Sequence, residues 1–305
     1  MYSMQSPEHL TPKQELIANF EQRAKDSFSF RLLWQYYKLS GGKHALESLP
    51  ESGALHDYSK ATLAMFNLQV ESDLPEWLQS ETGQGILIYG PHTFRLEPFI
   101  LSHLLSRREI YFVAISRSLF MLPEKFQDMV LPVTPSYLAK DARKRSGVAG
   151  INQRIRQSMF TNDDMRTVAE MKQANLAVSQ KAAELLRAGK VVVIFPSSAR
   201  DMYSSRWNNG IGQIVSYLDP EIDNVLLQPY DMTQISIRTA MRNMRRKYVL
   251  HQNEEPTQID VTWKPPLTVA EVYTDTQINN PEPSEIAELL AQNYKSPDGL
   301  YLSSN

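Results

Sequence analysis

A short apolar run, a turn and a helical pattern follow one another in Gly85-Ile-Leu-Ile-Tyr-Gly-Pro-His-Thr-Phe-Arg-Leu-Glu-Pro-Phe-Ile100. Residues 86–89 are apolar and rich enough in β-formers to make a buried strand. Gly90-Pro91 ends this strand, because proline has no N–H to donate to a sheet. A helix is predicted to follow, because apolar residues recur at three- and four-residue spacings at Leu96, Phe99, Ile100 and Leu104.

This pattern places His92 in the turn between strand and helix, with Glu97 in the first turn of the helix. A carboxylate there interacts favourably with the helix dipole. It is also within reach of an imidazole five positions earlier. A histidine base needs one ring nitrogen oriented by a carboxylate and the other free to take a proton. A His-x4-acid pair is common by chance, so a structural histidine is the alternative on this stretch alone.

Composition excludes several classes of site. The net charge of −2 gives no global field that would select nucleic acid, and the absence of cysteine excludes disulfides, thiolate metal sites and a cysteine nucleophile. The first residues lack the basic and apolar regions of a signal peptide, and no window approaches about 18 uninterrupted apolar residues. We therefore expect a cytoplasmic protein that is soluble or lies peripherally on a membrane.

Residues 1–80 read as a small helical cap. Thr11-Pro12 suits the start of a helix, and an aromatic cluster covers residues 28–37. Further helices are expected at residues 58–68 and 74–78. The structural interpretation is a cap packed on the main domain, and the alternative is an amphipathic surface that binds a membrane or a partner.

Residues 81–305 alternate between strand and helix, which predicts an α/β domain with a mostly parallel sheet flanked by helices. Pro132 argues for an edge position of one strand. The expected strands are residues 86–89, 110–115, 129–133, 191–195, 225–229 and 259–263, and the expected helices include 96–105, 171–188 and 281–294.

Two basic clusters interrupt this rhythm, one between residues 140 and 156 and one at helical spacing between residues 238 and 247. Each is interpreted either as a solvated surface or as a rim that attracts phosphates or anionic lipid headgroups. Their members are Lys140, Arg143, Lys144, Arg145, Arg154 and Arg156 in the first, and Arg238, Arg242, Arg245, Arg246 and Lys247 in the second.

A second informative stretch is Phe195-Pro-Ser-Ser-Ala-Arg200, which also ends a strong strand. An arginine just past the carboxyl end of a strand is well placed to hold an anionic ligand in an α/β sheet.

Together, in this order and spacing, the two stretches resemble the glycerolipid acyltransferase family (glycerol-3-phosphate and 1-acylglycerol-3-phosphate acyltransferases). The family's Asn-His-x4-Asp-Pro motif is similar to Pro91-His92-x4-Glu97-Pro98, and its Phe-Pro-Glu-Gly-Thr-Arg motif is similar to residues 195–200. Leu227-Gln-Pro229 resembles the fourth motif. The resemblance covers roughly residues 80–300 and leaves the cap unexplained.

The chain also departs from the family pattern. Glutamate replaces aspartate at position 97, and Ser197-Ser198 replaces Glu-Gly, which removes a charge near the acceptor site. The second motif is unclear. By spacing it falls near residues 129–135, which contain no arginine, and a similar run at residues 150–154 lies about twenty positions late.

The resemblance implies an acyltransferase that moves a fatty acyl group from acyl-CoA or acyl carrier protein to a hydroxyl of a glycerol-phosphate-like or lysolipid acceptor. His92 is then the general base and Glu97 its orienting acid. No metal or organic cofactor is implied, and no nucleic-acid partner is expected. The expected acceptor-binding residues are Arg200, Ser197, Ser198 and Arg95.

The alternative, favoured by the altered motifs, is a family member that has lost catalysis and binds an acyl chain, a lipid or a protein. A hydrolase is a weaker third possibility, because no Gly-x-Ser-x-Gly elbow is present.

Overall fold

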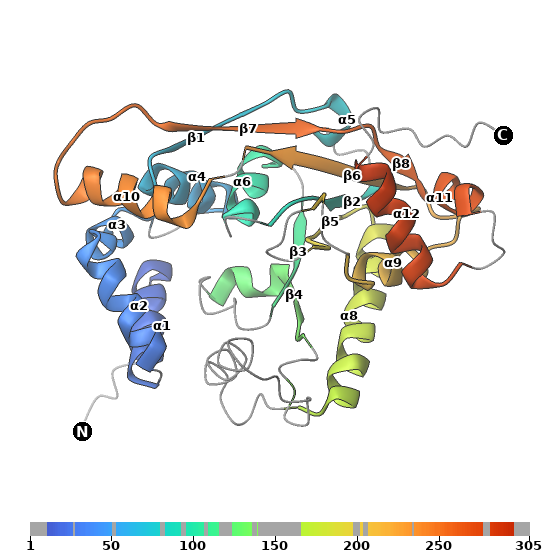
Figure 1. The fold of residues 1–305 in the computed structure, drawn as a ribbon, viewed down its shortest axis with the longest axis horizontal. Helices are drawn as coiled ribbons and strands as arrows, with labels where there is room; N and C mark the ends of the chain where they lie inside the picture. Colours follow the sequence, from blue (N-terminus) through green and yellow to red (C-terminus); the bar gives the residue numbers. More distant parts are fainter. Residues whose placement is uncertain are drawn as a thin grey trace, which may run out of the picture.

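The computed structural model describes residues 11–26, 28–50, 53–79, 83–92, 96–106, 109–115, 124–135, 139, 166–197, 202–203, 207–233, 235–276 and 281–295. Within these ranges the strands form one eight-stranded sheet of order β1-β7-β6-β2-β5-β3-β4, with β8 paired to β6 (Figure 1). All pairings are parallel except those of β6 with β7 and with β8. The predicted α/β class with a mostly parallel sheet flanked by helices is therefore confirmed.

Continuous apolar runs form the centre of this sheet. Every residue of β2 and β5 is buried, as expected for parallel strands covered on both faces. Pro132 lies in β4, at the edge of the sheet, which is the position where a strand tolerates proline. The strands are β1 (Leu68–Ser72), β2 (Gly85–Tyr89), β3 (Ile110–Ile115), β4 (Val130–Val133), β5 (Val191–Ile194), β6 (Val225–Met232), β7 (Thr257–Trp263) and β8 (Leu267–Thr268).

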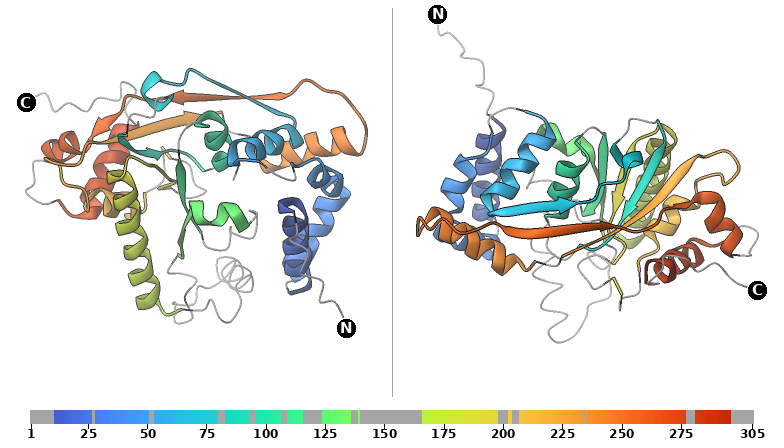
Figure 2. Two further views of the ribbon diagram at one scale, coloured as in Figure 1. Left: turned by 180° about the vertical axis from the view of Figure 1, so that it is seen from behind. Right: turned by 90° about the horizontal axis from the view of Figure 1, so that it is seen from above.

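Helices cover the two faces of the sheet and bury a separate core on each (Figure 2). One core contains side chains of α3, α4, α6 and α10, and the other contains side chains of α8, α9, α11 and α12. None of the described helices is long and apolar enough to cross a membrane. The helices are α1 (Pro12–Asp26), α2 (Phe28–Leu39), α3 (Gly42–Glu47), α4 (Leu55–Met65), α5 (Glu76–Gln79), α6 (Glu97–Leu104), α8 (Val168–Arg187), α9 (Gly210–Val215), α10 (Ile237–Tyr248), α11 (Val269–Thr276) and α12 (Pro283–Lys295), with a 3-10 helix η2 (Glu124–Met129).

The beginning of β2 is fixed closely against α8. A Cβ at Gly85 would lie 2.0 Å from the carbonyl oxygen of Leu186, so only glycine fits there. Because β2 is parallel to both β5 and β6, the carboxyl ends of these three strands meet at one edge of the sheet. The candidate site lies at this edge.

The N-terminal region differs from the purely helical cap that the sequence predicts. Residues 68–72, of which Leu68 was placed in a helix, form β1, and this strand pairs in parallel with β7. The helices α1, α2, α3 and α4 agree with the helical character expected of this region, and α1, α2 and α3 share a small core with α4 and η2. The division into a cap of residues 1–80 and a domain of residues 81–305 stays a prediction. The basic cluster of residues 140–156 lies outside the described residues, whereas the second cluster forms α10.

Candidate functional site

His92 and Glu97 make the contact that their spacing predicts. Nδ1 of His92 lies 3.1 Å from Oε2 of Glu97, and the carboxylate is fully buried in the first turn of α6. The histidine side chain is 26% exposed, and Nε2 has no hydrogen-bond partner among the described residues. One ring nitrogen is therefore held by an anion while the other is free to exchange a proton.

Phe195 fixes the plane of the imidazole. Its ring stacks on that of His92, with 4.4 Å between the centroids and 25° between the planes. Such a stack contributes about 0.5–1.5 kcal/mol beyond the area that it buries. Phe195 directly follows β5, and His92 follows the neighbouring β2. The two strand-end motifs therefore meet at these two residues, from neighbouring strands.

The turn before His92 is held by β6. The hydroxyl of Tyr230, a fully buried residue, donates to the carbonyl oxygen of Pro91 at 2.9 Å. Burial, and then the negative charge of Glu97, raises the pKa of Tyr230 well above its usual value, so the phenol keeps its proton for this bond. A Cβ at Gly90 would lie 2.3 Å from the Tyr230 ring, which explains the glycine. Sequence reasoning missed Tyr230, although it follows the Pro229 already noted for its resemblance to the fourth motif.

The turn after β5 carries the second predicted group of site residues. Asn208 donates to the carbonyl oxygen of Pro196 from its backbone N–H at 2.9 Å and from its side-chain amide at 2.8 Å. Ser197 is 1% exposed, two residues beyond the ring that stacks on His92. The remaining predicted acceptor-binding residues, Ser198, Arg200 and Arg95, lie outside the described residues, so their placement stays a prediction.

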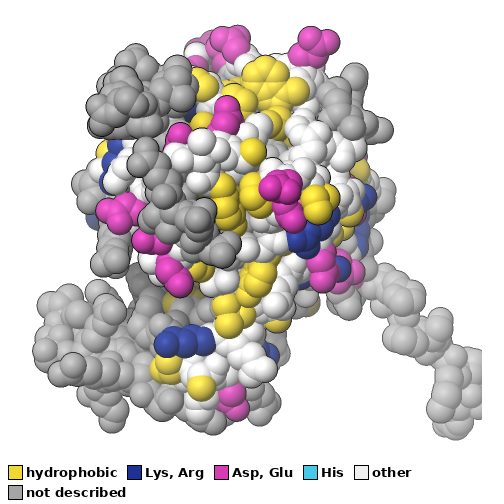
Figure 3. All heavy atoms as spheres, turned by 90° about the vertical axis from the view of Figure 1, so that its right-hand side faces the viewer, with side chains coloured by type: hydrophobic (Ala, Val, Ile, Leu, Met, Phe, Trp, Pro, Cys, Tyr) yellow, Lys and Arg dark blue, Asp and Glu magenta, His cyan; other side chains and the backbone are white. Residues whose placement is uncertain are grey.

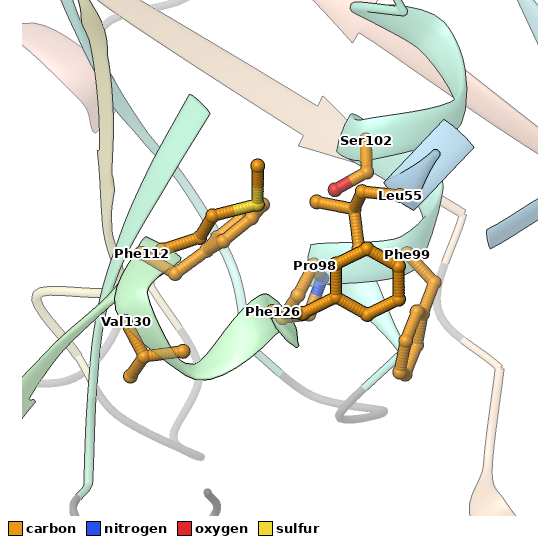
Figure 4. Close-up of a pocket in the computed structure, with 8 residues that line it drawn as sticks. Leu55, Pro98, Phe99, Ser102, Phe112, Phe126 and Val130 are labelled. Atoms are coloured by element: carbon orange, nitrogen blue, oxygen red, sulfur yellow. The ribbon is translucent and has the colours of Figure 1, made fainter. Parts of the chain in front are cut away.

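An apolar cavity lies beside the first turn of α6, next to Pro98 (Figure 4). The space inside it that a water-sized molecule can reach is about 20 Å³. The hydroxyl of Ser102 points into it and has no hydrogen-bond partner in the described structure (Figure 4). Its walls come from α4, α6, β3, η2 and β4, and the lining residues are Leu55, Pro98, Phe99, Ser102, Phe112, Phe126, Met129 and Val130.

Lys264 lies on the other face of the sheet, where its charge is already engaged. Its Nζ is 4.1 Å from the ring centroid of Tyr294 and donates to the carbonyl oxygen of the same residue at 2.5 Å. Burial lowers the pKa of Lys264, and the charge of Asp231 opposes that shift. We therefore assign it a structural role.

No cluster of three His, Asp or Glu side chains that could hold a metal ion occurs among the residues that the structure describes. The expectation that the site uses no metal or organic cofactor stays a prediction. Comparison of the sequence with models of known protein families and with curated proteins gives no match.

Proposed function

We propose that this chain is an acyltransferase of the glycerolipid type. It moves a fatty acyl group from a thioester, either acyl-CoA or acyl carrier protein, to a hydroxyl of a glycerol-phosphate-like or lysolipid acceptor. The observation that carries the proposal is the His92–Glu97 pair, with a fully buried carboxylate on Nδ1 of an imidazole whose side chain is partly exposed. The resemblance of the two strand-end motifs to that family gives the reaction class.

The pair supports general-base chemistry through a defined tautomer. Glu97 accepts a hydrogen bond from Nδ1–H, so the lone pair of the neutral ring lies on Nε2. The carboxylate also stabilises the positive charge that appears when Nε2 is protonated. Phe195 limits rotation of the ring from one side.

In the proposed reaction Nε2 of His92 removes the proton from the acceptor hydroxyl. The oxygen attacks the thioester carbonyl carbon, a carbon–oxygen bond forms, and the carbon–sulfur bond breaks. The leaving thiolate then takes the proton from the imidazolium, so no covalent acyl-enzyme is formed. Such a base contributes about 10²–10⁴-fold to the rate.

The cavity beside Pro98 offers a place for part of the acyl chain, because its lining is apolar apart from Ser102. The enclosed space of about 20 Å³ is far below the roughly 300–1,000 Å³ of a pocket that takes a drug-sized ligand, so the cavity as it stands takes at most the end of a chain. Arg200, Arg95, Ser197 and Ser198 are the proposed contacts to the anionic group of the acceptor.

The second candidate is a binding module for an acyl chain or a lipid. It is favoured by one observation, the replacement of the acid and glycine of the third motif by Ser197-Ser198. The contact between His92 and Glu97 favours the enzyme, because binding alone does not require an oriented imidazole with one accessible nitrogen.

His92→Gln separates these candidates. Its amide can still donate to Glu97, so the buried carboxylate keeps a partner, but it cannot take a proton. We expect transfer of a labelled acyl group to glycerol phosphate, lysophosphatidate and other hydroxylated acceptors to fall by about 10²–10⁴-fold. His44→Gln is the matched control, because His44 contacts Glu47 at 3.3 Å with its side chain 71% exposed. The proposal fails if the wild type transfers to no acceptor yet binds acyl chains as tightly as His92→Gln does.

A further inference from the structure

One side of α10 presents three unpaired arginines to solvent. Arg238, Arg242 and Arg245 are exposed, recur at four- and three-residue spacings, and make no ion pair within the described structure. The opposite side of the helix is anchored in the core by Ala240 and Met244. The helix contains no acidic residue.

The stability of the helix does not explain this arrangement. Arg238 lies in the first turn, two residues after the cap Ser236, where a cation opposes the helix dipole. Arg242 lies four positions from Arg238 and four from Arg246, and like charges at this spacing destabilise a helix. Only the charges of the last turn favour the helix, and Arg246 there is paired with Glu254 at 2.7 Å. The first two turns therefore carry positive charge at a cost to the helix.

Exposed apolar side chains continue this surface at the carboxyl end of α10. Val249 and Leu250 are 41% and 50% exposed, and Leu39, at the end of α2, is 75% exposed. The two segments touch, since a Cβ at Gly41 would lie 3.1 Å from Cγ2 of Val249. Figure 1 shows α10 and α3 lying beyond the tip of the β6 arrow.

We propose that these six side chains form a docking surface for an anionic lipid bilayer. Guanidinium groups beside apolar side chains are the combination that binds the headgroup region, where the charges meet phosphates and the apolar groups insert. Each cation near an anionic membrane surface raises the partition coefficient about fivefold, so the three arginines together should raise it about 100-fold. We name this set, Arg238, Arg242, Arg245, Leu39, Val249 and Leu250, the α10 surface.

The charge distribution elsewhere supports a directed contact. On the face that Figure 3 presents, which carries α11 and α12, Lys and Arg side chains are interspersed with Asp and Glu. Of the acids described near α10, Glu254 is paired with Arg246, Glu47 contacts His44, and Glu255 is exposed. Because α10 begins five residues after β6 ends, a bilayer on this surface lies near the sheet edge that holds His92. The proposal does not depend on acyl transfer.

The test is sedimentation of the full chain with vesicles of phosphatidylcholine alone or with about one third phosphatidylglycerol. We expect binding to the anionic vesicles at low salt and its loss at about 0.5 M salt, because screening weakens exposed charges. Arg242→Gln/Arg245→Gln should weaken partition about 25-fold, or fivefold for each lost cation. Leu39→Ser/Leu250→Ser should weaken it too, without changing its salt dependence.

Two controls change the same chemistry elsewhere. Lys172→Gln/Lys181→Gln removes two exposed cations from α8, and Ile222→Ser removes a side chain that is 78% exposed. Both should bind vesicles as the wild type does, and circular dichroism reports folding. The inference is overturned if the wild type does not bind anionic vesicles, or if the α8 variant loses as much vesicle binding as the α10 variant. It is also overturned if an acidic polypeptide binds in an arginine-dependent manner while vesicles do not bind.

Discussion

Replacing Glu97 by glutamine removes a charge and leaves almost the same shape. The carboxylate is fully buried, and its Oε2 lies 3.1 Å from Nδ1 of His92. A hydrogen bond to a charged group contributes about 1.5–3 kcal/mol, against about 0.5–1.5 kcal/mol for a neutral one. Loss of about 1–1.5 kcal/mol of imidazolium stabilisation should lower kcat about 5- to 12-fold.

The stability of the same variant should behave differently. A buried carboxylate carries a desolvation penalty that a neutral amide does not, and the amide oxygen of glutamine can still accept a hydrogen bond from Nδ1–H. We expect the free energy of unfolding of Glu97→Gln to stay within about 1 kcal/mol of wild type or to rise. If Glu97 serves catalysis, removing its charge should therefore lower activity without lowering the free energy of unfolding.

The assay pairs single-turnover acyl transfer with urea unfolding. Glu97→Asp is the third variant: shortening the side chain by one carbon–carbon bond of about 1.5 Å takes the carboxylate out of hydrogen-bonding distance unless α6 shifts. Glu184→Gln on the exposed face of α8 is the control. If Glu97→Gln keeps full kcat but unfolds more easily by over about 3 kcal/mol, the pair is a structural ion pair and our reasoning about the base is wrong.

Three further variants probe the surroundings of the pair. Tyr230→Phe leaves the carbonyl of Pro91 without its buried donor, so we expect a loss of about 1–3 kcal/mol in urea unfolding together with lower kcat; unchanged kcat would show that the turn does not position His92. Ser102→Ala removes an unpartnered buried hydroxyl and should raise the free energy of unfolding by about 1 kcal/mol. A lower free energy of unfolding would show that the hydroxyl does have a hydrogen-bond partner in the cavity. Burial, followed by the charges of His56 and Lys60, lowers the pKa of His103 in the folded chain. The unfolded chain therefore takes up a proton at His103 more readily, and the free energy of unfolding should fall as the pH drops through about 6.5. His103→Gln should flatten this pH dependence when unfolding is measured between about pH 7.5 and 5.5.

The sheet was predictable where its strands are buried on both faces. Residues 86–89 and 191–194 are continuous apolar runs because helices cover both sides, and no other local structure suits them as well. β1 is different: its sequence Leu-Gln-Val-Glu-Ser has two apolar residues, and its pairing with residues 257–261 decides its structure. Local pattern carries no information about that partner.

The contacts of the site likewise include some that the local sequence predicts and others that depend on the whole sheet. His92 and Glu97 are five positions apart, so a strand–turn–helix pattern was enough to predict their contact. The bond from Tyr230 to Pro91 joins residues 139 positions apart, and the stack of Phe195 on His92 depends on β2 and β5 being neighbours. Strand order is a property of the whole sheet, so these contacts required the structure.

The arrangement around His92 bears on the choice between catalysis and binding. A carboxylate taken fully out of water costs several kcal/mol unless hydrogen bonds offset the loss. Three further features surround this carboxylate: Gly90 after β2 has no room for a Cβ, the ring of Phe195 after β5 stacks on the imidazole, and the buried Tyr230 of β6 holds the turn. All of them fix one imidazole whose side chain stays partly exposed and whose Nε2 has no hydrogen-bond partner among the described residues. Apolar packing alone would hold an acyl chain at lower cost, which is why we favour proton transfer at His92 over simple binding.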